Sequence, residues 1–240
     1  MASQSTINYS TSSRPTSDAG MEAVTNFMTR RNPSNDFLFN NVRNGEVAVD
    51  WKKANGSPYL NENFAPCTLY SNKELLGSFF FRYNAYNDEL ELKESLNDPQ
   101  VSSLIKDNQF RLSDGSGTYM YVTLVSKKNE HSEGYLNLIV PGDRFKLFRK
   151  DFVKFKKGAA AANSMVKSTP DKFTNFAEYY YADNNDQNQK AYILENNLKN
   201  FLNSLKKEER GKIKSIIKEQ NLNTKKEADL IVLFKSINTL

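Results

Sequence analysis

Short alternating segments separated by hairpin-length turns run through the middle of this chain, and they constrain its fold more than any other feature. From residue 56 onward, apolar residues recur at alternate positions, as in 89–93, where Leu90 and Leu92 alternate with charged residues. Segments of this period, spaced by about ten residues, are typical of a meandering antiparallel sheet. We therefore expect a protein of the α+β class, with an antiparallel β sandwich or a partly open barrel.

The expected strands are short and closely spaced. In the strand that ends near residue 156, alternation places Phe152 and Lys154 opposite Val153 and Phe155. After the third strand the chain becomes polar, and we expect a short helix around 99–105. The strands that the alternation predicts cover 68–70, 75–83, 89–93, 109–112, 118–125, 134–140, 145–148, 151–156 and 173–181.

The hydrophobic period becomes helical after a polar break at 182–189. Thr224 and Glu227 have the spacing of a capping box, which predicts the start of a helix. Amphipathic stripes of this kind predict a small C-terminal helical segment. The three stripes cover 194–205, 213–217 and 228–237.

Composition divides the chain into four parts. The first is rich in Ser, Thr and Asn and cannot bury enough apolar surface to offset ordering entropy. The second carries scattered apolar anchors, which either lie over the sheet as a strap or dock on a partner. The parts are a disordered tail (1–20), the strap (21–55), the β domain (56–185) and the helical segment (186–240). The candidate partner-binding residues are Phe27, Met28, Phe37 and Phe39.

Cysteine and histidine counts limit the chemistry. The chain has one Cys and one His, which excludes an intramolecular disulfide and a His/Cys-rich zinc site. The sequence indicates no catalytic residue, metal or cofactor. It has no apolar stretch of the roughly 20 residues that a membrane-spanning helix needs. The net charge of +5 is mild for a nucleic-acid-binding protein.

Two motifs resemble those of a known family. GSPYLNENF covers 56–64 and FRYNAYNDELELK covers 81–93, and a weaker stretch follows from Gly134 to Phe148. Over residues 56–240 the chain resembles a family of uncharacterised exported proteins of Bacteroidota. The resemblance implies a removed signal peptide and a place in the periplasm or at the outer membrane, and it implies no catalytic residues.

The first residues allow two interpretations. Ala2 and Ser3, followed by Gln4, fit the end of a signal peptide and the start of a mature chain. The alternative is a natural start in the cytoplasm. The resemblance favours the first interpretation.

The second motif predicts a hairpin that fixes its own register. Arg82 is expected to pair with Glu89 or Glu91 across the hairpin, an interaction worth about 0.2–1 kcal/mol. The two glutamates are expected on a solvated strand face, with Asp88 bonding within its own turn. The alternative is a hydrolase that uses Asp88, Glu89 or Glu91 as general acid and base. The structural motif comprises Arg82, Tyr83, Asn84, Asp88, Glu89 and Glu91.

The strongest basic run covers 144–157, where Phe alternates with Lys and Arg. Such a pattern can bind single-stranded nucleic acid, with bases stacking on rings and cations following the backbone. It can equally form a charged strand edge that prevents aggregation. The candidate anion contacts are Arg144, Lys146, Arg149, Lys150 and Lys154.

These patterns together favour a binding role. We expect a non-enzymatic bacterial envelope protein that acts as a binding or accessory subunit of an outer-membrane-associated assembly. The alternatives are a single-stranded nucleic-acid-binding protein and the carboxylate-dependent hydrolase. The sequence leaves the partner, any ligand and the oligomeric state open.

Overall fold

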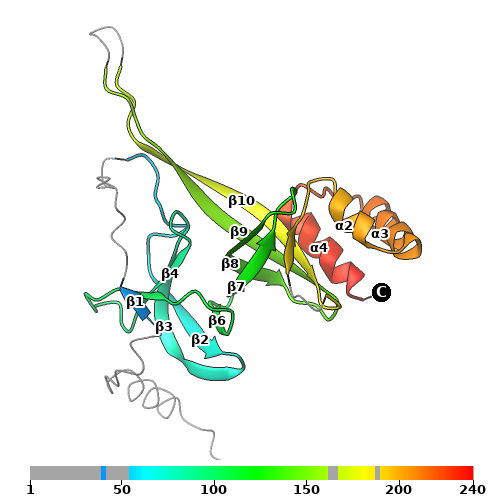
Figure 1. Ribbon diagram of the computed structural model, residues 1–240, viewed down its shortest axis with the longest axis horizontal. Helices are drawn as coiled ribbons and strands as arrows, with labels where there is room; N and C mark the ends of the chain where they lie inside the picture. Colours follow the sequence, from blue (N-terminus) through cyan, green and yellow to red (C-terminus); the bar gives the residue numbers. More distant parts are fainter. Residues whose placement is uncertain (1–38, 42–53, 162–166, 187–189, 240) are drawn as a thin grey trace, which may run out of the picture.

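A single mostly antiparallel sheet dominates the protein, and helices follow it at the C-terminal end (Figure 1). The structure is a computed structural model that describes residues 39–41, 54–161, 167–186 and 190–239. The α+β class is therefore confirmed. The strands are β1 (Phe39–Asn41), β2 (Ala65–Ser71), β3 (Glu74–Asn84), β4 (Glu89–Lys93), β5 (Ser102–Leu104), β6 (Phe110–Ser113), β7 (Thr118–Val125), β8 (His131–Val140), β9 (Phe145–Lys156), β10 (Lys172–Asp183) and β11 (Ala191–Ile193). The helices are α2 (Lys199–Ser204), α3 (Lys207–Glu219) and α4 (Glu227–Ile237).

The strand pairings form two regions. The sheet runs in the order β1-β5-β4-β3-β2-β6-β7-β11-β10-β9-β8, and β7 also pairs with β8. The pairings therefore close a ring through β7, β8, β9, β10 and β11. Among the named strands of the described chain, β11 and β7 form the one parallel pair. The strands from β6 to β1 extend from this ring as an open sheet, which we call the open sheet below.

Three apolar clusters form the core. One packs the open sheet around Leu69, Phe79 and Leu90. A second packs the helices against the ring, with Phe201 and Phe234 buried. The third takes residues from all five ring strands. Because neighbouring residues of a strand point to opposite faces, Leu147 and Phe148 of β9 join different clusters.

Most expected strands form, with three differences. The two strands expected at 145–148 and 151–156 are one continuous strand, β9. The expected helix around 99–105 is wrong, because β5 occupies this segment and pairs with β4. The sheet also continues past residue 185 through β11.

The capping box at the start of α4 does not form. Lys226 is the N-cap residue, and it makes no side-chain cap hydrogen bond. The hydroxyl of Thr224 instead donates to the backbone oxygen of Asn196, at 2.6 Å. The prediction therefore placed the helix start correctly to within a few residues, but the stated cap is wrong. None of the described helices has the length and apolar character needed to cross a membrane.

The β9–β10 hairpin continues beyond the rest of the sheet (Figure 1). We call its described residues between 152 and 176 the arm. The chain at Asn55 lies beside the arm and forms a bridge with Lys172. Next to it, Gly56 has a φ of +83°, and a Cβ there would lie 2.7 Å from the backbone oxygen of Phe173. Glycine is thus required where this segment crosses the arm.

Candidate functional site

A cleft of about 500 Å³ opens between the open sheet, the ring and helix α4. Its size falls within the range of about 300–1,000 Å³ that is common for ligand sites. Leu60 and Arg82 line it from the open-sheet side. Tyr119, Asn137, the middle of β9 and the first turns of α4 line it from the other side. We take this cleft as the candidate binding site.

The polar side of the cleft belongs to a row of residues that crosses four neighbouring strands of the ring. Tyr119 of β7 lies opposite Asn137 of β8, and Asn137 lies opposite Arg149 of β9. Arg149 in turn lies opposite Tyr179 of β10. Directly opposed residues point to the same face of a sheet. The register therefore aligns a tyrosine, an amide, a guanidinium and a second tyrosine in one row.

Arg149 is held by two carboxylates. Its Nε donates to both oxygens of Asp151 at 3.0 Å, and its NH1 donates to Glu227 of α4 at 2.8 Å. Asp151 is only 7% exposed, so the guanidinium stabilises a buried charge. The hydroxyl of Tyr179 also donates to Glu227, at 2.9 Å. Burial, followed by this hydrogen bond, raises the pKa of Tyr179 to about 12, so it remains a donor at neutral pH.

Two polar groups of the row lack partners. Asn137 Oδ1 is buried and accepts no hydrogen bond within the described residues. Tyr119 is 5% exposed, and in the described part of the chain its hydroxyl forms no hydrogen bond. Burial, with the nearby Asp114 and Asp151, raises the pKa of Tyr119. A Cβ at Gly117 would lie 2.0 Å from Asn137 Oδ1, so only glycine leaves room for this amide.

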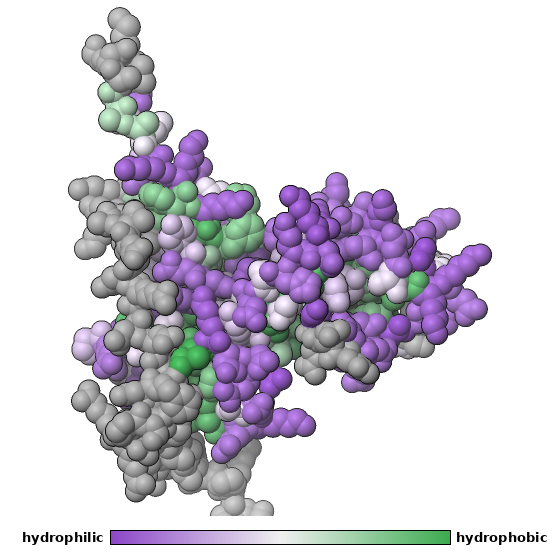
Figure 2. All heavy atoms as spheres, viewed as in Figure 1, coloured by the Kyte–Doolittle hydropathy of each residue, from purple (hydrophilic) through white to green (hydrophobic). Residues whose placement is uncertain are grey.

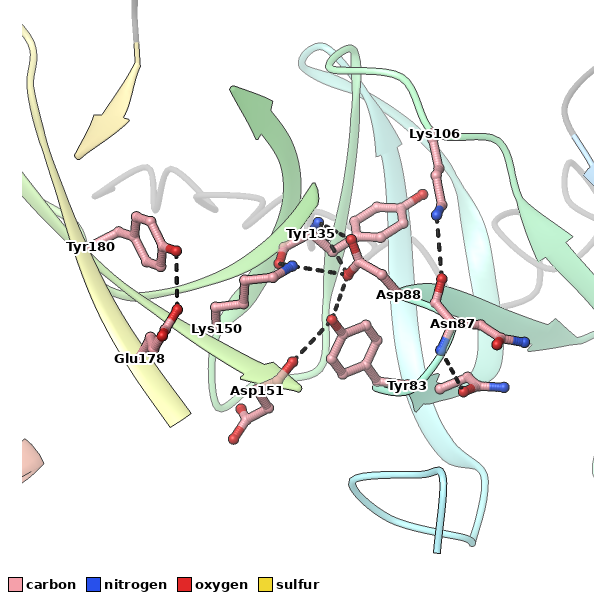
Figure 3. Close-up of polar contacts among 10 residues, drawn as sticks. Tyr83, Asn87, Asp88, Lys106, Tyr135, Lys150, Asp151, Glu178 and Tyr180 are labelled. Atoms are coloured by element: carbon pink, nitrogen blue, oxygen red, sulfur yellow. Dashed lines mark hydrogen bonds and ion pairs between the residues drawn. The ribbon is translucent and has the colours of Figure 1, made fainter. Parts of the chain in front are cut away.

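A second network joins the open sheet to the ring (Figure 3). The carboxylate of Asp88 accepts hydrogen bonds from the Tyr83 hydroxyl at 2.5 Å and from the Tyr135 backbone N–H at 3.2 Å. It also pairs with Lys150 at 3.2 Å. Burial and the adjacent Asp88 raise the pKa of Tyr83 well above its usual value. The expectation that Asp88 bonds within its own turn is therefore wrong, because it reaches β8 and β9.

The predicted pair across the β3–β4 hairpin is confirmed. Arg82 lies directly opposite Glu91, and their charged atoms are 2.7 Å apart. However, Glu91 is only 1% exposed, so the expected solvated face is wrong for this residue. Its carboxylate also accepts from Asn84 Nδ2 at 3.3 Å and from the Tyr59 hydroxyl at 3.4 Å.

The two sequence motifs contact each other through the same pair. Arg82 donates to the Tyr59 hydroxyl at 2.8 Å, and its guanidinium carbon lies 3.8 Å from the centre of the Tyr59 ring. Tyr59 belongs to the first motif and Arg82 to the second. The motifs therefore form one packing unit. Neither Asp88, Glu89 nor Glu91 lines the cleft, so the structure does not bring the proposed hydrolase residues to it.

Most of the predicted anion contacts are engaged in ion pairs. Arg144 pairs with Glu209, whose pKa this hydrogen bond lowers. Arg149 and Lys150 pair with acids as described above. Burial lowers the pKa of Lys146, which lies opposite Ala182 of β10. The basic run therefore forms no continuous cationic surface along β9.

Lys154 differs from the others because it lies on the arm. Phe152 and Phe176 face each other there, with ring centres 5.4 Å apart and planes inclined by 17°. The Lys154 ammonium lies 5.5 Å and 5.3 Å from the two ring centres. The predicted alternation is thus confirmed, since Val153 joins the core on the opposite face. Figure 2 shows hydrophobic atoms exposed along the arm beside hydrophilic side chains.

The predicted partner-binding residues lie mostly beyond the described chain. Phe27, Met28 and Phe37 lie outside the described residues. Phe39 lies in β1, where its backbone is opposite Leu104 of β5. This part of the chain therefore adds an outer strand to the open sheet.

The sequence reasoning missed most of the cleft. Arg149 was predicted as an anion contact, and Glu227 was predicted as part of a helix cap. Tyr119 and Asn137 were predicted only as parts of strands. The one local signal is Gly117, whose small size admits Asn137. Within the described ranges, no three His, Cys, Asp or Glu side chains come together as a metal site.

Comparisons with protein-family models, with curated proteins and with solved structures found no match to this chain. The resemblance to exported proteins of Bacteroidota therefore stays a prediction.

Proposed function

We propose that this protein is a non-enzymatic accessory subunit of a bacterial envelope assembly, and that its arm docks on an acidic surface of a protein partner. The observation that carries the proposal is the stacked pair of Phe152 and Phe176 on the arm, in which Phe152 is half-buried and Phe176 is exposed. Phe176 is 42% exposed, although a Phe ring of this kind is normally buried. Exposed aromatic residues in a protruding element are common anchors of protein interfaces.

Charge supports an acidic partner. Residues 154–172 contain five lysines and one acid, Asp171, so their net charge is 5 − 1 = +4. Of the described lysines in this segment, none forms an ion pair within the described chain. An acidic partner surface would be steered to such a segment and would complement it. The place in the envelope rests on the two motifs in 56–93.

Site-specific photo-crosslinking in cells tests the docking surface. A crosslinker at Thr174, on the same face as Lys154, should capture one protein, whereas a crosslinker in the exposed turn at Lys128 should not. With that protein purified, Phe176→Ser should weaken binding about tenfold or more, as for a central anchor. Leu75→Ser is the matched control, since Leu75 is also exposed. Equal crosslinking at both positions, or recovery of the chain in the cytoplasmic fraction, would contradict the proposal.

The same face favours one second candidate, single-stranded nucleic acid. Stacking of a base on an exposed aromatic ring contributes about 1–3 kcal/mol. The Phe152–Phe176 pair and the adjacent Lys154 provide rings and a cation together. Anisotropy of a labelled oligothymidine should then fall steeply with salt, because phosphate contacts release counterions. The absence of binding at low salt would remove this candidate.

We also infer that the β domain is a partly closed barrel and not a sandwich. The ring of pairings from β7 to β11 supports this interpretation. So does the third apolar cluster, which contains residues of each ring strand. An experimental structure with two separate stacked sheets would contradict it.

A further inference from the structure

The cleft is acidic in a protein that is basic overall. Two arginines, Arg82 and Arg149, and three carboxylates line it. The local formal charge is therefore 2 − 3 = −1, while the whole chain carries +5. A concave site of one charge concentrates counter-ions of the other. The carboxylates are Asp114, Asp151 and Glu227.

The cleft also has more hydrogen-bond acceptors than donors. Both arginines already donate to carboxylates, at 2.7 Å for Arg82 and 2.8 Å for Arg149 to Glu227. The side chain of Glu227 is 34% exposed and keeps unused acceptor positions toward solvent. The hydroxyl of the buried Tyr119, which lines the cleft, forms no hydrogen bond within the described chain. A ligand that fits this lining must bring N–H donors.

Apolar side chains complete the wall of the cleft. They come from the loop before β2, from β2 and β3, and from β8 and α4. Such side chains can hold an aliphatic stem while a charged group reaches the carboxylates, as in long cationic side chains. These residues are Leu60, Ala65, Phe81, Ile139 and Ile231.

We infer that the cleft binds an alkylammonium or alkylguanidinium group, with the cation at Glu227 and the Tyr119 hydroxyl and the stem along the apolar wall. The group can belong to a lysine or arginine side chain of a partner protein, or to a free amine. This site is separate from the arm, and the inference does not depend on the docking role of the arm.

Nuclear magnetic resonance of the full chain with four small probes tests the inference. Butylamine and butylguanidine are cations at neutral pH, butanol is a neutral analogue, and pentanoate is an anion. We expect the two cations to shift the amide signals of Tyr119, Asn137 and Glu227 at millimolar concentrations, and the other two probes to leave them in place. Stronger binding of pentanoate or butanol would overturn the inference.

Variants locate the cation within the cleft. Glu227→Gln keeps an acceptor for Tyr179 and removes the charge, and it should weaken butylamine binding about tenfold. Tyr119→Phe, a second change in the cleft, should also weaken it. Glu133→Gln is the matched control, because Glu133 likewise accepts from a tyrosine hydroxyl but lies outside the cleft. Equal affinities in Glu227→Gln, Tyr119→Phe and the unchanged protein would overturn the inference.

A capped pentapeptide with a central lysine between glycines separates the two sources of the group. Binding of the peptide about tenfold tighter than butylamine supports a side chain of a partner protein. Equal binding of the two supports a free amine. If neither probe shifts a cleft signal, the cleft is not a cation site and the inference fails.

Discussion

Removal of Arg82 should destabilise the protein more than removal of any exposed arginine. In Arg82→Met, the carboxylate of Glu91 stays buried at 1% exposure without its cation. It keeps only the Asn84 amide at 3.3 Å and the Tyr59 hydroxyl at 3.4 Å. Breaking a buried ion pair on one side costs about 3–5 kcal/mol, because an uncompensated charge remains.

The lower end of that range applies here. The side chain of Arg82 is 22% exposed, so water already screens part of the interaction. We therefore expect a loss of about 3 kcal/mol in the free energy of unfolding, or about a hundredfold in the unfolding equilibrium. Adding Glu91→Gln removes the buried charge, so the double variant should be more stable than Arg82→Met alone.

Urea unfolding followed by circular dichroism measures the free energy of unfolding of both the single and the double variant. Arg111→Met is the matched control, since this half-buried arginine makes only a solvent-exposed hydrogen bond, to the Asn72 backbone oxygen at 2.8 Å. It should cost less than about 1 kcal/mol. The reasoning is refuted if Arg82→Met costs no more than the control, or if Glu91→Gln fails to restore stability in its background.

Three further predictions follow from backbone geometry, burial and the network between the sheet and the ring. Gly56 and Gly115 share a φ of +83°, but only Gly56 would place a Cβ 2.7 Å from a backbone oxygen, whereas nothing lies within 4 Å at Gly115. Gly115→Ala should lower the stability by about 1 kcal/mol, because of its positive φ alone. Gly56→Ala should lower it by about 1–3 kcal/mol more, because its Cβ would also clash with the backbone oxygen. Equal losses of stability in thermal denaturation would contradict the close approach. Burial raises the pKa of Cys67 to about 12, so a disulfide reagent at pH 8 should label the folded protein far more slowly than the unfolded one. Because this pKa is raised on folding, its contribution to stability is full below pH 9 and is lost as the pH rises toward 12; Cys67→Ala should therefore lose less stability over that interval. Asp88→Asn should speed hydrogen exchange of the Tyr135 amide about tenfold by weakening its acceptor, and unchanged exchange would show that the network is not what holds the two regions together.

The local sequence pattern was sufficient to predict features that depend on a single strand or a single hairpin. Alternation predicted that Leu90 and Leu92 are buried, and hairpin geometry predicted the Arg82–Glu91 pair. It did not predict burial of Glu91, because that depends on the segment 56–64 packing over β4. The placement of such a covering segment is a long-range property that a period of two does not contain.

The cleft depends on register between strands. Tyr119, Asn137 and Arg149 become neighbours only through the pairings of β7, β8 and β9, and the β8–β9 pairing contains an irregularity between Leu138 and Val140. A shift by one residue would reverse which side chains face the cleft. The closure of the ring could not be predicted from the sequence either, since β11 is only three residues long and pairs in parallel with β7.

The contacts of the basic residues in 144–157 follow from the path of β9 through the structure. On one face of this strand, Arg149 lies in the cleft and Val153 packs against the open sheet. On the other face, Lys150 meets Asp88, and only beyond it does Lys154 reach the exposed side of the arm. On the covered part of β9, Arg149 and Lys150 thus meet acids and Lys146 is partly buried, whereas Lys154 lies on the exposed face of the arm. Anion binding should therefore weaken in Lys154→Ala and stay unchanged in Lys146→Ala, and the reverse result would place the anion surface on the body and not on the arm.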